Sequence, residues 1–90
     1  MNNGRIFTEA EEEFVQSLVA SLPPVIARKE VKTYLGGIIA PQTLSNADAS
    51  GEGPQVAYKI GRNVVYKTEE LIIWIVERFG VSRLKKVKGL

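Results

Sequence analysis

The side chains that could do chemistry in this sequence are amides and cations, not nucleophiles or metal ligands. The chain has no Cys and no His, so it lacks the usual nucleophile–base pairs and the common zinc ligands. Glu11, Glu12 and Glu13 are consecutive, so their carboxylates point in different directions and do not converge on a metal ion. The Gly-rich segment 51–54 lacks the third glycine of a phosphate loop. The sequence therefore predicts a protein that is not an enzyme and has no cofactor or metal.

Two amides that lie one helical turn apart, Gln42 and Asn46, are suited to reading the edge of a base. Either amide can pair bidentately with N6 and N7 of adenine, and Thr43 can meet a thymine methyl group or a base edge. Arg62 lies in a Gly-Arg-Asn turn, from which it can enter a narrow minor groove, whose negative potential attracts arginine. The alternative at each position is an ordinary solvated side chain.

Further polar and cationic residues accompany this set. Lys59, Asn63 and Lys67 flank Arg62 and are expected to contact phosphates. A second group can meet the DNA backbone where a first helix crosses it, or else form a solvated helix face; its members are Arg28, Lys29 and Lys32.

Charge is spread unevenly along the 90 residues, whose formal net charge is +2. Residues 1–20 sum to −3 because four glutamates outweigh Arg5, and residues 21–90 sum to +5. The last ten residues carry Arg83, Lys85, Lys86 and Lys88 without an acid. The positive charge of residues 21–90, after an acidic segment 1–20, favours a polyanionic partner. The alternative is a solvated charged surface with a frayed C-terminal tail.

The composition, 44% apolar and 24% charged, is that of one small globular domain. The absence of cysteine fits a reducing cytoplasm, and the acidic N-terminus shows no apolar signal-peptide region. The longest apolar run has six residues, 71–76, far short of the roughly 20 that a membrane span needs. We expect a cytoplasmic, nucleoid-associated protein.

Four helices are predicted. The first runs from 9 to about 21 behind a Thr8–Glu11 capping box and ends at Pro23-Pro24. The second, 28–35, has an inner face of Val31, Tyr34 and Leu35 and ends at a pair of glycines. The third, 41–50, begins with proline at its first position and turns Leu44 and Ala47 inward. The fourth, 69–79, follows Thr68 as N-cap and is apolar on more than one face.

The stretch from 55 to 67 alternates as two strands. Val56, Tyr58 and Ile60 form the expected buried face of the first strand, and Val64 and Tyr66 that of the second. The turn at 61–63 offers Gly and Asn to take positive φ. Among the aromatic residues, Tyr34, Tyr58 and Trp74 are expected in the core or at its edge.

Two short helices joined by a glycine turn and followed by a hairpin form a winged helix-turn-helix. The predicted fold is α+β, mainly α: a winged helix-turn-helix with a two-stranded hairpin wing, an extra N-terminal helix and a C-terminal helix. The expected division is an N-terminal arm with an acidic amphipathic helix (1–21), a winged helix-turn-helix domain (22–80) and a basic C-terminal tail (81–90).

Residues 22–79 resemble the excisionase-like, MerR-type winged helix-turn-helix proteins of phages and integrated elements. The residues that carry the resemblance are Arg28-Lys29-Glu30-Val31, Leu35-Gly36-Gly37, Pro41-x-Thr43-Leu44, Gly51-x-Gly53-Pro54, Lys59-Ile60-Gly61-Arg62, Val65-Tyr66 and Leu71-x-x-Trp74. The resemblance implies a small accessory protein that places its second motif helix in the major groove and its wing on the minor groove or backbone of double-stranded DNA. It implies either a recombination directionality factor, which bends DNA and guides a tyrosine-type integrase toward excision, or a transcriptional regulator. Self-association on DNA or through the N-terminal helix is a further expectation.

A protein-interaction module that has lost DNA binding is the alternative from another class. The third helix has no basic residue and carries Asp48, and the first helix is acidic. Ala27 and Ala40 stand ahead of the two motif helices, where the family has Ser or Thr. A missing N-cap costs about 1 kcal/mol.

Overall fold

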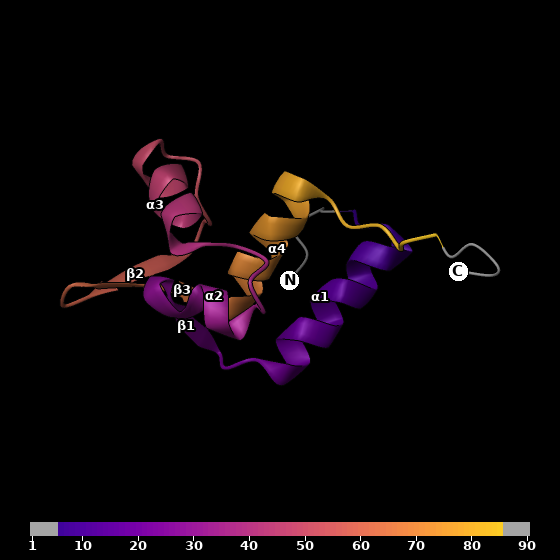
Figure 1. The fold of residues 1–90 in the computed structure, drawn as a ribbon, viewed down its shortest axis with the longest axis horizontal. Coiled ribbons are helices and arrows are strands. Elements are labelled where there is room, and N and C mark those ends of the chain that lie inside the picture. The colour runs from indigo at the N-terminus through magenta and orange to yellow at the C-terminus, as the bar shows by residue number, and fades with distance from the viewer. Residues whose placement is uncertain (1–5, 86–90) are drawn as a thin grey trace.

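The computed structural model of this chain describes residues 6–85 (Figure 1). Over that range it is a small, helix-rich α+β domain with four α-helices and a three-stranded antiparallel sheet, so the expected fold class is confirmed at this level. In chain order the elements are α1 (Glu9–Ser21), β1 (Val25–Ala27), the 3-10 turn η1 (Arg28–Glu30), α2 (Val31–Tyr34), α3 (Pro41–Ala49), β2 (Ala57–Ile60), β3 (Asn63–Lys67) and α4 (Thr68–Phe79).

Helix α1 begins and ends where the sequence predicts. The Thr8 N–H donates to Glu11 Oε1 at 2.9 Å, and the Glu11 N–H donates to Thr8 Oγ1 at 3.1 Å, which completes the predicted capping box. Val15 is buried, and Phe14 and Leu18 pack against the same core. Figure 1 shows α1 beside α4, on the side of the molecule away from the β2–β3 hairpin.

The predicted two-stranded hairpin forms as β2 and β3, but the sheet has a third strand, β1, that the sequence did not predict. Residues 25–27 pair antiparallel with β3, with Val25 opposite Lys67 and Ile26 opposite Tyr66, and the strand order is β1-β3-β2. Pro23 and Pro24 hold the chain extended as it approaches β1. A strand of three residues is too short for alternation to reveal it, so only its long-range partner identifies it.

The second predicted helix, 28–35, forms as the tighter η1 followed by one α-helical turn, α2. Val31 and Leu35 are fully buried, but Tyr34 is 48% exposed, so its placement on the inner face was wrong. A single short turn brings only one narrow stripe of side chains, four residues apart, to the core. Gly36 and Gly37 end the helix with φ of 61° and 84°, as expected.

Helix α3 is one residue shorter than predicted, with Ser50 as its C-cap. Leu44 and Ala47 are buried, as expected. Ala40 provides no side-chain cap, which the sequence also indicated, and Pro41 occupies the first turn.

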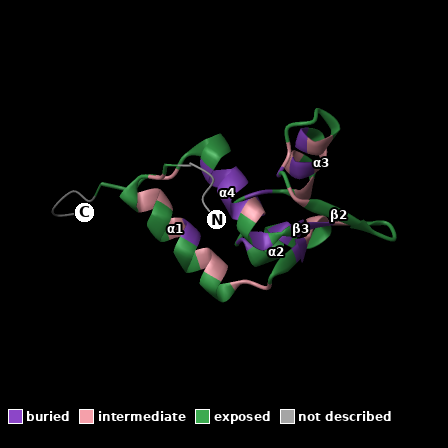
Figure 2. Cartoon of the chain, turned by 180° about the vertical axis from the view of Figure 1, so that it is seen from behind, coloured by how far each residue is buried: buried purple, intermediate pink, exposed green. Residues whose placement is uncertain are grey.

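Strand β2 lies at the edge of the sheet and all four of its residues are exposed. Tyr58 and Ile60, predicted to be buried, are 51% and 61% exposed, because the hairpin projects beyond the helices (Figures 1 and 2). Tyr58 pairs with Val65 and so lies on the sheet face opposite that of Tyr66. The turn has two residues, Gly61 with φ of 63° and Arg62, so Asn63 belongs to β3 and not to the turn.

Helix α4 buries six consecutive side chains, 71–76, which confirms a helix packed on more than one side. Trp74 is in the core, as predicted, and its indole N–H donates to the Glu52 carbonyl at 2.8 Å. Thr68 is not the N-cap; Lys67 is. The buried Thr68 hydroxyl instead donates to the Pro23 carbonyl, and the Thr68 N–H donates to the Pro24 carbonyl at 2.9 Å. None of the helices between residues 6 and 85 combines the length and hydropathy needed to cross a membrane.

Candidate nucleic-acid interface

Helix α3 and the hairpin tip lie at the same end of the molecule, and α1 lies at the other end (Figures 1 and 2). The outward face of α3 carries Gln42 and Asn46, both exposed as predicted. Gln42 Nε2 donates to Asn46 Oδ1 at 2.9 Å, which holds the two amides side by side. An amide group has two N–H donors and two acceptor lone pairs, so each side chain still presents a donor and an acceptor to solvent. Thr43 is half-buried at the edge of this face.

The hairpin tip approaches the start of α3. Six residues line a hollow of about 170 Å³ between η1, the first turn of α3 and the tip; we call it the junction hollow, and its residues are Arg28, Lys29, Pro41, Arg62, Asn63 and Val64. Arg62 and Lys29 are exposed, and no lining residue is acidic. The fold thus brings together two groups of cations that are more than 30 residues apart in the sequence.

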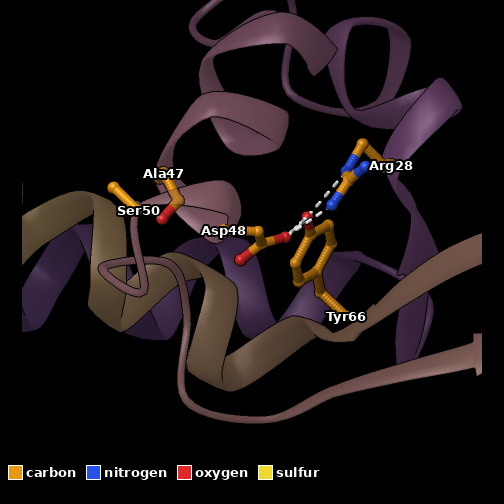
Figure 3. A network of polar contacts seen from close by, with 5 residues as sticks. All are labelled: Arg28, Ala47, Asp48, Ser50 and Tyr66. Atoms are coloured by element: carbon orange, nitrogen blue, oxygen red, sulfur yellow. Dashed lines mark hydrogen bonds and ion pairs between the residues drawn. The ribbon is translucent and has the colours of Figure 1, made fainter.

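Arg28, Asp48 and Tyr66 form a half-buried polar network that joins η1, α3 and β3 (Figure 3). Arg28 Nη2 lies 2.6 Å from Asp48 Oδ2, and Arg28 Nε donates to the Tyr66 hydroxyl at 2.9 Å. The Tyr66 hydroxyl in turn donates to Asp48 Oδ2 at 2.5 Å. The side chains of Arg28 and Asp48 are 24% and 26% exposed. The network therefore fixes α3 to the sheet and the hairpin.

The protonation states of the network follow from burial and mutual contact. Burial and the hydrogen bond to Asp48 raise the pKa of Tyr66 to about 12. Burial alone lowers the pKa of Arg28, but its bonds to Tyr66 and Asp48 outweigh that effect and raise the pKa above its ordinary value. At neutral pH Tyr66 is thus an uncharged donor and Arg28 is a cation.

The Asp48 carboxylate is directed into this network and not onto the face that carries Gln42 and Asn46 (Figure 3). Its charge is compensated by Arg28 within the protein, whereas the sequence showed only an acid on a helix without a cation. No local signal reveals this arrangement, because the partners of Asp48 lie 20 and 18 residues away. Figure 3 also shows the end of α3, where the Ser50 hydroxyl donates to the Ala47 carbonyl at 3.0 Å.

The loop after α3 closes over Asp48. A Cβ atom added to Gly53 would lie 1.8 Å from Asp48 Oδ1 and 3.3 Å from the Asp48 backbone nitrogen. Any larger residue at this position would push the Asp48 side chain out of its place, since real Cβ atoms do not come so near another heavy atom. Gly51 has a different role, because it ends α3 with φ of 77° and has open space around it.

Several predicted site residues are not brought to the junction hollow. Lys67 pairs with Val25 at the far end of β3 and lies on the opposite sheet face from Val64. Lys32 is exposed on α2, outside the lining. Lys59 pairs with Val64 across the hairpin but is not part of the lining. Arg28 is engaged by Asp48 and Tyr66 and is therefore not a freely moving cation.

The basic tail begins at the other end of the molecule. Arg83 Nη2 lies 3.1 Å from Glu13 Oε1, which ties the tail to α1. Lys86 and Lys88 lie outside the described residues. Tyr66 is fully buried, so it offers no face for stacking on a base. Between residues 6 and 85, no three His, Cys, Asp or Glu side chains gather in a way that could hold a metal ion.

No protein-family model, curated protein or solved structure matches this chain. The resemblance to excisionase-like proteins therefore stays a prediction from the residues.

Proposed function

We propose that this chain is a sequence-specific DNA-binding protein with no enzymatic activity, built as a winged helix-turn-helix. In this proposal η1 and α2 form the first motif helix, α3 is the recognition helix and the β2–β3 hairpin is the wing. One observation carries the proposal: the exposed amides of α3 lie at the same end of the molecule as the exposed Arg62, which lines a hollow with no acidic residue.

The proposed contacts are of two kinds: contacts to base edges, which read the DNA sequence, and contacts to the DNA backbone, which position the protein. Gln42 and Asn46 read base edges in the major groove, where an amide pairs bidentately with adenine. Arg62 enters the adjacent minor groove or lies on its phosphates. The positioning contacts to the backbone come from Lys29, Lys32 and Lys59.

The charges give the proposal a measurable salt dependence. Helix α3 carries no cation, so the backbone contacts come from η1, α2 and the hairpin. With about four phosphate contacts at roughly 0.9 per contact, the slope of log K against log salt concentration is about −3 to −4. The Asp48 carboxylate does not oppose this attraction fully, because Arg28 compensates its charge.

The biological role that we propose is that of an excisionase-like recombination directionality factor, which binds and bends DNA beside a tyrosine-type integrase. The sequence resemblance over residues 22–79 supports this role. A small transcriptional regulator of a phage or mobile element is the alternative with the same DNA contacts. The gene that neighbours this one separates the two, since an adjacent recombinase favours excision.

A protein-interaction module is a second candidate function, and a specific observation favours it. A mainly apolar groove of about 490 Å³ lies between α1, α4 and the loop before α3. Ile38 and Phe79, which line it, are largely exposed. This function predicts binding to a protein without binding to DNA at moderate salt.

The experiment that tests the proposal is binding to a duplex selected from random sequence, followed by fluorescence anisotropy across a salt series. We expect Arg62→Ala to weaken binding about tenfold, within the roughly 1–3 kcal/mol of a specific Arg contact. Arg83→Ala is the matched control, because it removes the same charge from an exposed ion pair at the other end of the molecule. Equal affinities of the two variants, or no salt slope for the wild type, would contradict the proposal.

A further inference from the structure

We propose that the junction hollow is a phosphate-binding site, in which Lys29 of η1 and Arg62 of the hairpin tip hold one phosphodiester group of the DNA backbone between them. This inference rests on the proposed function and adds to it the identity of a single bound group. It also gives Arg28 a role that differs from the free backbone contact expected from the sequence.

The hollow has the size that such a group needs, and cations from two elements border its mainly apolar lining. Its volume is about 170 Å³, whereas one water molecule occupies about 30 Å³ in the liquid, so a tetrahedral phosphate and a few waters fit. Two exposed cations, Lys29 and Arg62, approach it from different elements, and Asn63 adds an amide that can donate. Because the lining contains no carboxylate, both Lys29 and Arg62 attract a phosphate without an opposing negative charge in the lining.

Arg28 contributes a guanidinium that is already fixed in place. A guanidinium has five N–H donors in one plane. The Nε donor goes to Tyr66 and one Nη2 donor goes to Asp48. The remaining donors are free of these two partners, and Arg28 lines the hollow. Because Asp48 and Tyr66 hold the side chain, binding a phosphate costs little of the rotamer entropy that a free arginine would lose.

A phosphate held from both sides couples the hairpin to the helices. Lys29 belongs to η1 and Arg62 to the hairpin tip, so one shared ligand fixes how far apart the wing and the first motif helix stand on the duplex. When two cations share a phosphate, the loss of one loosens the grip of the other. The loss of DNA affinity in the double variant must then be smaller than the product of the losses in the two single variants.

The first test is a double-mutant cycle in DNA affinity with Lys29→Ala and Arg62→Ala. If each change weakens binding about tenfold, we expect the double variant to lose about 10- to 30-fold instead of about 100-fold. The matched control cycle pairs Arg62→Ala with Lys67→Ala, which lies at the far end of β3 and outside the lining, and the effects of these two substitutions should multiply. If the separate effects of Lys29→Ala and Arg62→Ala multiply in the double variant, as in the control cycle, the inference is overturned. The proposed DNA-binding function would not be affected by that result.

The second test needs no DNA, and so separates this inference from the proposed function. The full chain is titrated with inorganic phosphate at constant ionic strength and followed by amide NMR. We expect saturable shifts at residues 29, 62 and 63, with a dissociation constant on the order of millimolar. Lys29→Ala should abolish them and Lys32→Ala, one turn away and outside the lining, should not.

The outcomes point in different directions. Saturable shifts at the hollow in a protein that binds no duplex would support the anion site and refute the DNA-binding function. Shifts spread evenly over all exposed cations would show that no phosphate site exists at the hollow and would overturn the inference. Circular dichroism of each variant checks that these surface substitutions leave the fold unchanged.

Discussion

For the substitution Asp48→Asn, the net charge and the polar network predict opposite changes in DNA affinity. Removing a carboxylate from a DNA-binding domain raises its net charge from +2 to +3, and on charge alone the affinity for a duplex increases. The structure predicts the opposite result. Asp48 Oδ2 accepts from both Arg28 and Tyr66, so the substitution removes the ion pair with Arg28 and leaves the Tyr66 hydroxyl bonded to a neutral group.

The magnitude follows from the burial of the pair. Hydrogen bonds to a charged group contribute about 1.5–3 kcal/mol each, and neutral ones about half of that. The side chains are about a quarter exposed, so solvent screening reduces the difference, and we expect a loss of about 1–2 kcal/mol in the free energy of unfolding. In a domain of this size that corresponds to a fall in melting temperature of about 4–16 °C.

The effect on DNA binding comes from lost positioning. Without the carboxylate, Arg28 is no longer held at the hollow and α3 is less firmly fixed to β3. We expect Asp48→Asn to weaken binding about threefold to tenfold, within the coupling range of residues in one network. Binding is measured by anisotropy at a temperature where circular dichroism shows both proteins fully folded.

Glu30→Gln is the matched control for this prediction. Glu30 is exposed on η1 and makes no side-chain cap to α2. Its loss changes the net charge by the same amount near the same surface, so we expect unchanged stability and slightly stronger binding. If Asp48→Asn binds more tightly than the wild type and melts at the same temperature, the reasoning about the network is refuted.

Two other predictions concern the same network. The difference between the alkaline absorbance titrations of wild type and Tyr66→Phe should show one tyrosine ionising near pH 12, and a midpoint near 10 would contradict the network. Because the folded pKa is raised above its ordinary 10.0, the stability that Tyr66 adds is complete below pH 10 and is lost as the pH rises through about 12. Gly53→Ala should lower the melting temperature more than Gly51→Ala, since its Cβ meets Asp48 while Gly51 has open space and only an unfavourable φ; the reverse order would show that the loop does not close on Asp48.

Local signals in the sequence were sufficient for the two elements with clear boundaries. The capping box at Thr8 and Glu11 and the following proline pair define α1, and Pro41 with Gly51 bounds α3. These signals act through hydrogen bonds and backbone preferences within a few residues, so they can be seen without tertiary structure.

The failures share a long-range cause. Thr68 looked like an N-cap, but its hydroxyl is taken by Pro23, 45 residues away. Tyr58 and Ile60 follow the pattern of a half-buried strand, but the hairpin projects beyond the helices and all four residues of β2 are exposed (Figure 2). The alternation of apolar and polar residues shows which side chains share a face of the strand, but it does not show whether another element packs on that face.

In the candidate site, too, some residues were predictable from local sequence signals and others were not. The exposed amides on α3 and Arg62 at the hairpin tip follow from helix and hairpin periodicity, and the structure places them as the sequence indicated. The network of Arg28, Asp48 and Tyr66 and the approach of η1 to the hairpin tip could not be predicted, because only the tertiary fold brings these residues together.

The most direct measurement of the central claim is an NMR titration of the full chain with the selected duplex, observing side-chain as well as backbone signals. We predict that the side-chain amides of Gln42 and Asn46 and the Nε–H of Arg62 shift together and saturate at the same DNA concentration, while α1 is unaffected. Shifts confined to α1 and to the groove beside Phe79, or none at all, would contradict the claim that α3 and the hairpin tip bind one duplex.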